Sequence, residues 1–263
     1  MAASTAPARR FGSLGQWTFV VFMVLLMALF VTLGTWQVQR LAEKEALIAR
    51  VEARFNETPA AFPPADTWSS LDPEALDYRP FGASGTFRHD LTVLVFDNLT
   101  DANGQFSGPG YWVMAPLETR DGGVLWVNRG FVPESQAAAF ANGGLATEGE
   151  ITIQGIARRP QQANPFTPGP EVAKRREWVR DPERLDLFLP EGMGPAAPVT
   201  LDQVAGAPGS LPQGGETQIV FPNRHLEYAG TWFGFALVTL VMLGYWIWRQ
   251  RHPGNLAERD NGN

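Results

Sequence analysis

Two long apolar stretches without charged residues lie at opposite ends of the chain and enclose a polar segment rich in glycine and proline. The first covers residues 14–38 and the second residues 228–248. A hydrocarbon core of about 30 Å requires about 20 apolar residues of helix, and each stretch supplies them. The pattern therefore predicts two transmembrane helices at the two ends of the chain.

Positive charges predict the orientation of these helices. Arginines flank both on the side away from the central segment: Arg9, Arg10, Arg249 and Arg251. Because short arginine-rich flanks stay in the cytoplasm, the two ends (1–13 and 249–263) are predicted to be cytoplasmic. The central segment 39–227 is then an exported domain, periplasmic in a bacterium.

The alternative for the first stretch is a cleaved signal peptide. Its apolar run is longer than the core of a signal peptide, and Leu33-Gly34-Thr35-Trp36-Gln37 is a poor cleavage site. An uncleaved anchor is the favoured interpretation.

Short apolar runs separated by polar turns predict that the central segment is mainly β. Five runs have this pattern: 81–87, 91–97, 111–117, 124–132 and 151–157. Asp121-Gly122, between the third and fourth, is typical of a hairpin turn. Helical patterns extend the first predicted span and mark three short helices, at 37–55, 73–76, 134–140 and 181–188.

The order of these elements favours an antiparallel sheet or a small barrel over parallel βαβ units. We therefore predict an α+β membrane protein. Two transmembrane helices at the chain ends would flank one exported, mainly antiparallel β domain with a few short helices.

Composition narrows the classes of function. The chain has 21 Lys+Arg against 27 Asp+Glu, and 16 of the bases and 25 of the acids fall within 39–227. Such an acidic exported domain argues against nucleic-acid binding. Cysteine is absent, so the domain must be stable without disulfides, and thiol redox chemistry is excluded.

The motifs of common enzyme classes are missing. The sequence has no P-loop, no GxGxxG after a predicted strand, no GxSxG and no HExxH. Its three histidines are too few for a histidine-rich metal site. His89, beside Asp90, fits a solvated turn residue. We expect no enzymatic activity.

Another histidine stands just before the second apolar stretch. On a helix, His225, Tyr228, Ala229 and Trp232 share one face by their spacing of three, four and seven. A neutral imidazole beside two aromatic rings at a membrane surface suits the iron of a lipophilic haem, and either Arg224 or Arg40 suits haem propionates. The alternative is an interfacial aromatic belt that only anchors the helix.

Four segments, in their order and spacing, resemble the Surfeit locus protein 1 family of assembly factors for haem–copper cytochrome c oxidase. They are Leu33-Gly34-Thr35-Trp36-Gln37-Val38-Gln39-Arg40, Gly110-Tyr111-Trp112-Val113-Met114-Ala115-Pro116-Leu117, Val127-Asn128-Arg129-Gly130-Phe131-Val132-Pro133 and His225-Leu226-Glu227-Tyr228-Ala229-Gly230-Thr231-Trp232. A weaker match is Asn164-Pro165 followed by Trp178-Val179-Arg180-Asp181. The chain departs from the family pattern at Phe131, where tryptophan is usual. The stretches 143–150 and 192–215 match nothing specific.

This resemblance implies an inner-membrane protein that assists maturation of oxidase subunit I, with other oxidase subunits, assembly factors and membrane lipid as further partners. It also implies that haem a is handled transiently, with His225 as the ligand of the haem iron. Trp36, Arg40, Tyr228 and Trp232 would complete the cofactor site if the two helices pack together.

A second group, Asn128, Arg129 and Gly130, lies inside a predicted strand between apolar residues. Arg129 suits a partner or a haem propionate, or it is a buried, paired arginine that fixes the sheet, with Gly130 allowing close backbone approach. The structural role is favoured.

Two hypotheses for the function remain. In the first, the protein receives haem a and passes it to subunit I. In the second, it is a haem-free scaffold that holds subunit I during assembly, and His225 is dispensable.

Overall fold

The computed structural model describes residues 13–144, 149–204, 206, 208–217 and 223–252. The chain forms two compact units, one from residues 1–49 and 220–263 and the other from residues 50–219. Arg9 and Arg10, on which the predicted orientation partly rests, lie outside the described residues.

Two long helices form the first unit. Helix α1 (Leu14–Phe55) has 42 residues, and α4 (His225–Arg251) has 27. Both are long and apolar enough to cross a membrane. Only 11% of the most apolar 18-residue segment of α1 is buried, and only 17% of that of α4. The core helix of a soluble protein would be mostly buried, so these helices fit a membrane-associated protein. The helical pattern predicted for 37–55 is confirmed, because α1 continues through it.

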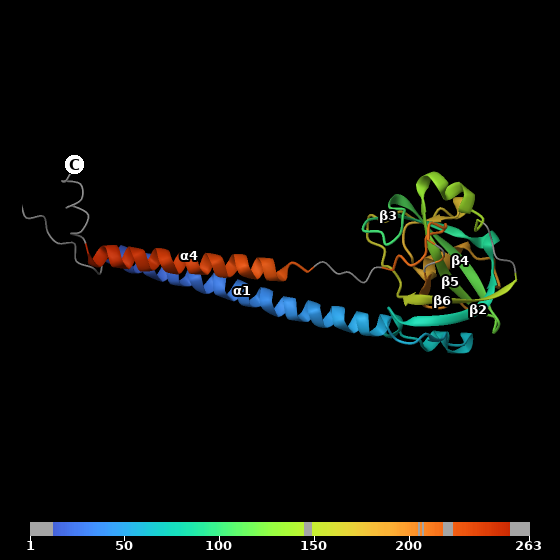
Figure 1. Cartoon of the computed structure of the whole chain (residues 1–263), viewed down its shortest axis with the longest axis horizontal. Coiled ribbons are helices and arrows are strands. Elements are labelled where there is room, and N and C mark those ends of the chain that lie inside the picture. The colour runs from blue at the N-terminus through green and yellow to red at the C-terminus, as the bar shows by residue number, and fades with distance from the viewer. Residues whose placement is uncertain (1–12, 145–148, 205, 207, 218–222, 253–263) are drawn as a thin grey trace, which may run out of the picture. The chain divides into compact units, whose positions relative to one another are not determined.

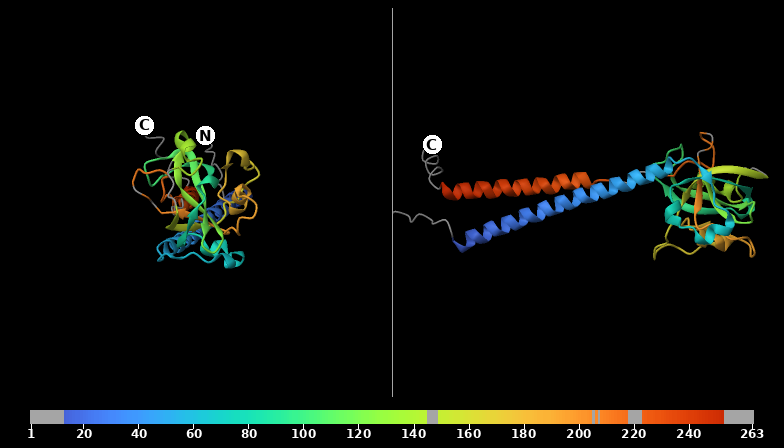
Figure 2. Two further views of the ribbon diagram at one scale, coloured as in Figure 1. Left: turned by 90° about the vertical axis from the view of Figure 1, so that its right-hand side faces the viewer. Right: turned by 90° about the horizontal axis from the view of Figure 1, so that it is seen from below.

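Helices α1 and α4 run side by side in opposite directions, as Figures 1 and 2 show. Gln16 contacts Gln250 at one end of the pair, and Gln37 contacts His225 at the other. The less exposed positions of α4 alternate in steps of four and three residues, the spacing of a coiled-coil seam: His225, Ala229, Trp232, Ala236, Thr239, Leu243, Trp246 and Gln250. On α1 the seam includes Met23, Phe30, Gly34 and Gln37.

A closed ring of five strands forms the second unit (Figure 1). In hydrogen-bonded order the strands are β2 (Pro80–Phe87), β6 (Glu150–Arg158), β8 (Thr200–Gln203), β5 (Val124–Pro133) and β4 (Gly108–Thr119). Pairing between β4 and β2 closes the ring. All pairs in it are antiparallel except β5 with β8. Of the two arrangements predicted, the structure is therefore the small barrel.

Three further strands extend the sheet beyond the ring. Strand β3 (Val93–Leu99) pairs with β4 and with the short β7 (Arg176–Glu177). Strand β1 (Ala60–Ala61) pairs with β2.

The central strands bury both of their faces. Along β5, Leu125 and Val127 belong to one apolar cluster with Leu117 and Leu201, whereas Trp126 belongs to a second cluster. All five are fully buried. The second cluster packs under α3 (Pro182–Leu185) and η5 (Asp186–Phe188). Because both faces are covered, β5 has a nearly continuous apolar sequence instead of a strict alternation.

Short helices and turns connect the strands. These are η1 (Ala65–Ser70), α2 (Pro73–Leu76), η2 (His89–Leu91), η3 (Glu134–Phe140) and η4 (Val172–Lys174). The helix predicted at 134–140 is a 3₁₀ helix, and the one predicted at 181–188 is a single α turn followed by a 3₁₀ turn. The predicted hairpin turn is present, with Gly122 at φ +82° between β4 and β5.

Candidate functional site

The candidate site lies at one end of the helix pair, where His225 begins α4. Its imidazole Nδ1 lies 2.8 Å from the side-chain Oε1 of Gln37 on α1. An amide oxygen only accepts hydrogen bonds, so the neutral imidazole that fits this contact carries its hydrogen on Nδ1 and donates a hydrogen bond to Gln37. The other ring nitrogen, Nε2, then has the free lone pair that a metal requires.

Small and aromatic side chains surround this pair along the seam. Ala229 is only 2% exposed, and the ring of Trp232 stacks on Phe30 with centroids 5.9 Å apart. A Cβ on Gly34 would lie 2.7 Å from the ring of Phe233, so glycine is what permits the helices to approach closely here.

Tyr228 lies at the edge of the face predicted for it. His225, Ala229 and Trp232 lie in the seam, whereas Tyr228 is 54% exposed. The reason is geometric: successive helical residues are about 100° apart, and the seam is narrower than the apolar stripe that the spacing suggested. Tyr228 therefore stands beside the seam and not within it.

Trp36 and Arg40 also lie outside the seam. Trp36 is 48% exposed. The guanidinium of Arg40 stacks over the Trp36 ring, 5.9 Å from its centroid, and pairs with Glu43 at 2.7 Å. Gln37, one residue after Trp36, is the side chain that meets His225. Gln37 was not among the predicted site residues; the four–three spacing of the seam is the signal that could have identified it.

Asn128 and Gly130 have structural roles in the barrel. The Asn128 side chain accepts a hydrogen bond from the Gly130 N–H at 3.0 Å and donates one to Asp202 at 3.0 Å. Gly130 has φ +133°, and a Cβ there would lie 2.4 Å from the backbone of Gln213. Phe131 exchanges two backbone hydrogen bonds with Gln213. The motif thus holds the segment around Gln213 against β5.

The Arg129 side chain contacts a different set of residues from Asn128 and Gly130. Its guanidinium donates a hydrogen bond to the carbonyl of Gly143, lies 3.4 Å from His89 Nδ1, and covers the ring of Phe87. Burial lowers the pKa of Arg129 below its usual value. No carboxylate among the described residues forms an ion pair with it. His89 is half-buried in this contact, so the prediction of a freely solvated turn residue is wrong.

The donor set at His225 fits a haem better than a bare metal ion. Within the part of the chain that the structure describes, no group of three or more His, Cys, Asp or Glu could hold a metal ion. A haem supplies four nitrogens itself and needs only one or two protein ligands. One oriented imidazole, nearby aromatic rings and an exposed arginine meet that requirement.

Comparisons with known proteins agree in one family. A model of the SURF1 family matches residues 24–237. A SURF1-like protein from Monosiga brevicollis is 34% identical over 97% of this chain and 94% of its own length. The mouse Surfeit locus protein 1 is 32% identical over 85% of this chain and 72% of its own, and the human one is 31% identical over 85% and 74%.

Proposed function

The chain belongs to the SURF1 family, and from that premise we propose that it is a membrane-anchored assembly factor for haem–copper cytochrome c oxidase. Its role would be to assist haem a insertion into subunit I, or to stabilise that subunit while haem enters. Other oxidase subunits, assembly factors and membrane lipid are the further partners. The function is that of a chaperone and not of an enzyme.

The observation that carries the haem proposal is the hydrogen bond between His225 and Gln37. Histidines that bind metals commonly donate their second N–H to an oxygen, which fixes the tautomer and the orientation of the ring. Gln37 provides that oxygen, so His225 presents Nε2 to the iron. Haem a would then be held by a single bond, from His225 Nε2 to the iron. A ligand in the oxidase can replace that bond.

The side chains around His225 would contact different parts of the haem. Trp232, in the seam, and the exposed rings of Trp36 and Tyr228 offer flat apolar surfaces for a macrocycle. Arg40 suits the propionates because a guanidinium recognises carboxylates. Glu43 already pairs with it in the exposed position, and a propionate would replace this weak surface ion pair.

We propose the bacterial inner membrane as the location, with both termini in the cytoplasm and residues 39–227 in the periplasm. Two sparsely buried apolar helices support the membrane location. Arginines that flank them on the side away from residues 39–227 support the orientation. His225 and Gln37 then lie where the apolar parts of their helices reach the periplasmic side. A lipophilic cofactor can pass along the membrane surface there.

The test is the optical spectrum of the full chain, purified in detergent after co-expression with the enzymes of haem a synthesis. The wild type should carry a haem a band that His225→Gly loses and that added imidazole restores. His252→Ala is the matched control, because His252 lies at the far end of α4; it should keep the band.

Two outcomes would reject haem transfer through His225. A band that persists in His225→Gly would move the ligand elsewhere. The absence of a band in the wild type, with subunit I still co-purifying, would leave the alternative function of a haem-free scaffold.

A further inference from the structure

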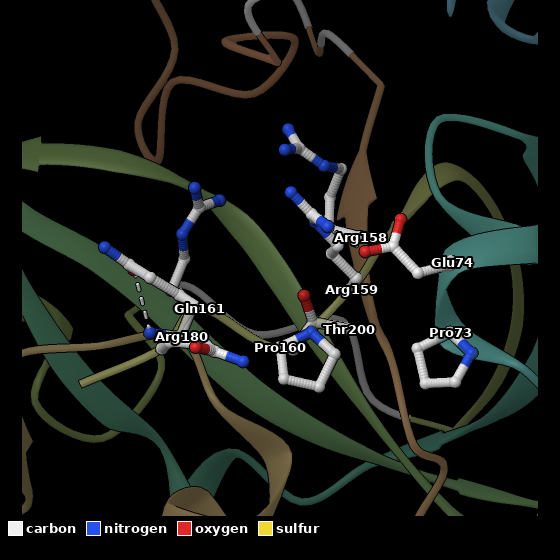
Figure 3. A pocket seen from close by; sticks show the side chains of 9 residues that line it. Pro73, Glu74, Arg158, Arg159, Pro160, Gln161, Arg180 and Thr200 are labelled. Carbon is white, nitrogen blue, oxygen red and sulfur yellow. Dashed lines mark hydrogen bonds and ion pairs between the residues drawn. The ribbon is translucent and has the colours of Figure 1, made fainter.

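The barrel unit contains an open cavity of about 780 Å³ that the assembly role does not use. Its wall combines α2, the end of β6 with the residues that follow it, and the start of β8. The lining residues are Pro73, Glu74, Arg158, Arg159, Pro160, Gln161, Gln162, Arg180 and Thr200. Figure 3 shows the three guanidinium groups and the Thr200 hydroxyl pointing to the same side of this wall.

The charged groups of the wall are mostly positive. Three arginines line the cavity against a single acid, Glu74. Two buried carboxylates form ion pairs with Arg158 and Arg180 without lining the cavity themselves. Asp77 Oδ1 lies 3.1 Å from Arg158 Nε, and Asp202 Oδ1 lies 3.2 Å from Arg180 Nη1. Glu74 in the wall pairs with Arg159. An anion inside the cavity therefore meets the guanidinium groups of Arg158 and Arg180 before it meets Asp77 and Asp202.

Aromatic rings fix two of these arginines further. The guanidinium of Arg158 lies 4.1 Å from the centroid of Tyr78, and that of Arg180 lies 5.1 Å from the centroid of Trp112. Both side chains are about one-fifth exposed. Guanidinium groups held in this way lose little further conformational entropy when they bind a ligand.

Among the residues that the structure describes, two donors in the wall have no partner. Arg180 Nε and Thr200 Oγ1 are buried atoms without a hydrogen bond, and Thr200 is fully buried. Leaving such an atom unsatisfied costs about 1–3 kcal/mol, so most buried polar groups in folded proteins have a partner. A pair of unsatisfied donors from two different elements, next to one cavity, indicates a missing acceptor.

From this geometry we infer that the cavity is a binding site for a carboxylate. Each unsatisfied donor can bond an oxygen of a carboxylate, and the planar guanidinium edge of Arg180 suits carboxylate geometry. Arg159, at the rim, adds attraction, and the amides of Gln161 and Gln162 can accept or donate to the rest of the ligand. This inference is independent of haem and of His225.

A carboxylate of this kind has two possible sources. One is a small organic acid, and the other is an acidic side chain of a partner polypeptide that enters the open cavity. The chemistry is shared, so the experiment must separate the two sources.

The test is calorimetric titration of the full chain in detergent, at low ionic strength, with succinate and with a hexaglutamate peptide. Thr200→Val is the main variant, because it has nearly the same shape and removes only the unsatisfied hydroxyl. Thr92→Val is its matched control: Thr92 is also fully buried with an unpartnered hydroxyl, but it does not line the cavity. Neither change should impair folding, since each removes a buried polar group that makes no hydrogen bond.

We expect the wild type and Thr92→Val to bind with equal affinity, and Thr200→Val to bind at least tenfold more weakly. Arg159→Gln should weaken binding too, whereas Arg120→Gln, at an exposed arginine that does not line the cavity, should not. Tighter binding of the peptide identifies a polypeptide source, and equal or tighter binding of succinate identifies a free acid.

Three results would overturn the inference. These are the failure of both carboxylates to bind the wild type, an unchanged affinity in Thr200→Val, and tighter binding of inorganic phosphate than of either carboxylate.

Discussion

His225 Nδ1 donates a 2.8 Å hydrogen bond to Gln37 Oε1 across 188 residues of chain. The two side chains occupy seam positions at one end of an antiparallel helix pair, and Gln37 is only 9% exposed. A polar pair at a seam position fixes the register of two helices, because a shift of either helix would leave both groups unsatisfied. The same contact fixes the tautomer of His225. Helix register and the proposed ligand geometry therefore share one hydrogen bond.

Replacing Gln37 should weaken haem binding without removing the ligand. Gln37→Leu deletes the oxygen that accepts from Nδ1, and losses of this kind typically cost 10–100-fold in metal affinity. Gln37→Glu keeps an acceptor and should bind haem at least as tightly as the wild type. Haem titration followed by absorbance measures both. Gln39→Leu is the control, since Gln39 is exposed on the same helix; an equal loss there would contradict the assigned role.

Gly34 should be required for the close approach of the helices. In Gly34→Leu the new side chain would occupy the position of the Phe233 ring, because a Cβ there already lies 2.7 Å from it. Overpacking of this kind typically costs about 1–3 kcal/mol. Thermal unfolding in detergent should show a lower Tm for Gly34→Leu. Gly234→Leu, where nothing lies within 4 Å of the Cβ position, should leave Tm unchanged, and a similar fall in both would count against a specific contact.

The local patterns of the sequence predicted most of the fold. Five predicted strands correspond to β2–β6, with ends that shift by at most a few residues. Strand β8 was missed because it has four residues inside a stretch rich in glycine and proline. Its pairing with β5 and β6 joins segments far apart in the chain, and periodicity within one segment cannot report such a contact.

The candidate site was predicted less completely, for a related reason. The spacing on α4 correctly placed His225, Ala229 and Trp232 together, because that relationship is local to one helix. It could not show which α1 side chain meets His225. Trp36 and Gln37 are neighbours in sequence but about 100° apart around the helix, so only the packing of the two helices selects Gln37.

The pH dependence of stability should contain a contribution from Asp186. Burial raises the pKa of this carboxyl, although the hydrogen bond from the Trp126 indole partly opposes the shift. The folded state therefore holds its proton to a higher pH than the unfolded state, and stability falls as pH rises from the unfolded value, about 3.9, through the raised folded value. At neutral pH the Asp186 carboxylate is charged, and the cost of burying that charge lowers the free energy of unfolding in full.

Asp186→Asn should remove that cost, because it keeps an oxygen to accept from Trp126 and carries no charge. Its Tm at pH 7 should exceed that of the wild type, and the difference should shrink as the pH is lowered toward 4. Glu183→Gln, at an exposed acid in the preceding helix α3, is the control for a general loss of negative charge. A constant difference between Asp186→Asn and the wild type across this pH range would contradict the assignment.

Gly130→Ala should be strongly destabilising. At φ +133° the backbone is outside the range of residues with a side chain, and the added Cβ would lie 2.4 Å from the backbone of Gln213. Together these effects should cost about 3 kcal/mol or more. Gly122→Ala is the comparison, because Gly122 also has positive φ but nothing lies within 4 Å of its Cβ position. It should cost only about 1–2 kcal/mol. Denaturant unfolding measures both, and equal costs would show that the contact with Gln213 is unimportant.

Single-cysteine variants can test the proposed orientation directly, since the chain has no cysteine of its own. Phe166 is 93% exposed in the barrel unit, and Ser13 is exposed just before α1. With residues 39–227 in the periplasm, a thiol reagent that cannot cross the inner membrane should label Phe166→Cys in intact cells. It should label Ser13→Cys only after that membrane is permeabilised, because a hydrocarbon core of about 30 Å separates the two positions. Labelling of both before permeabilisation would place the N-terminal end outside the cytoplasm. Labelling of Ser13→Cys alone would invert the orientation and move His225 away from the periplasmic surface.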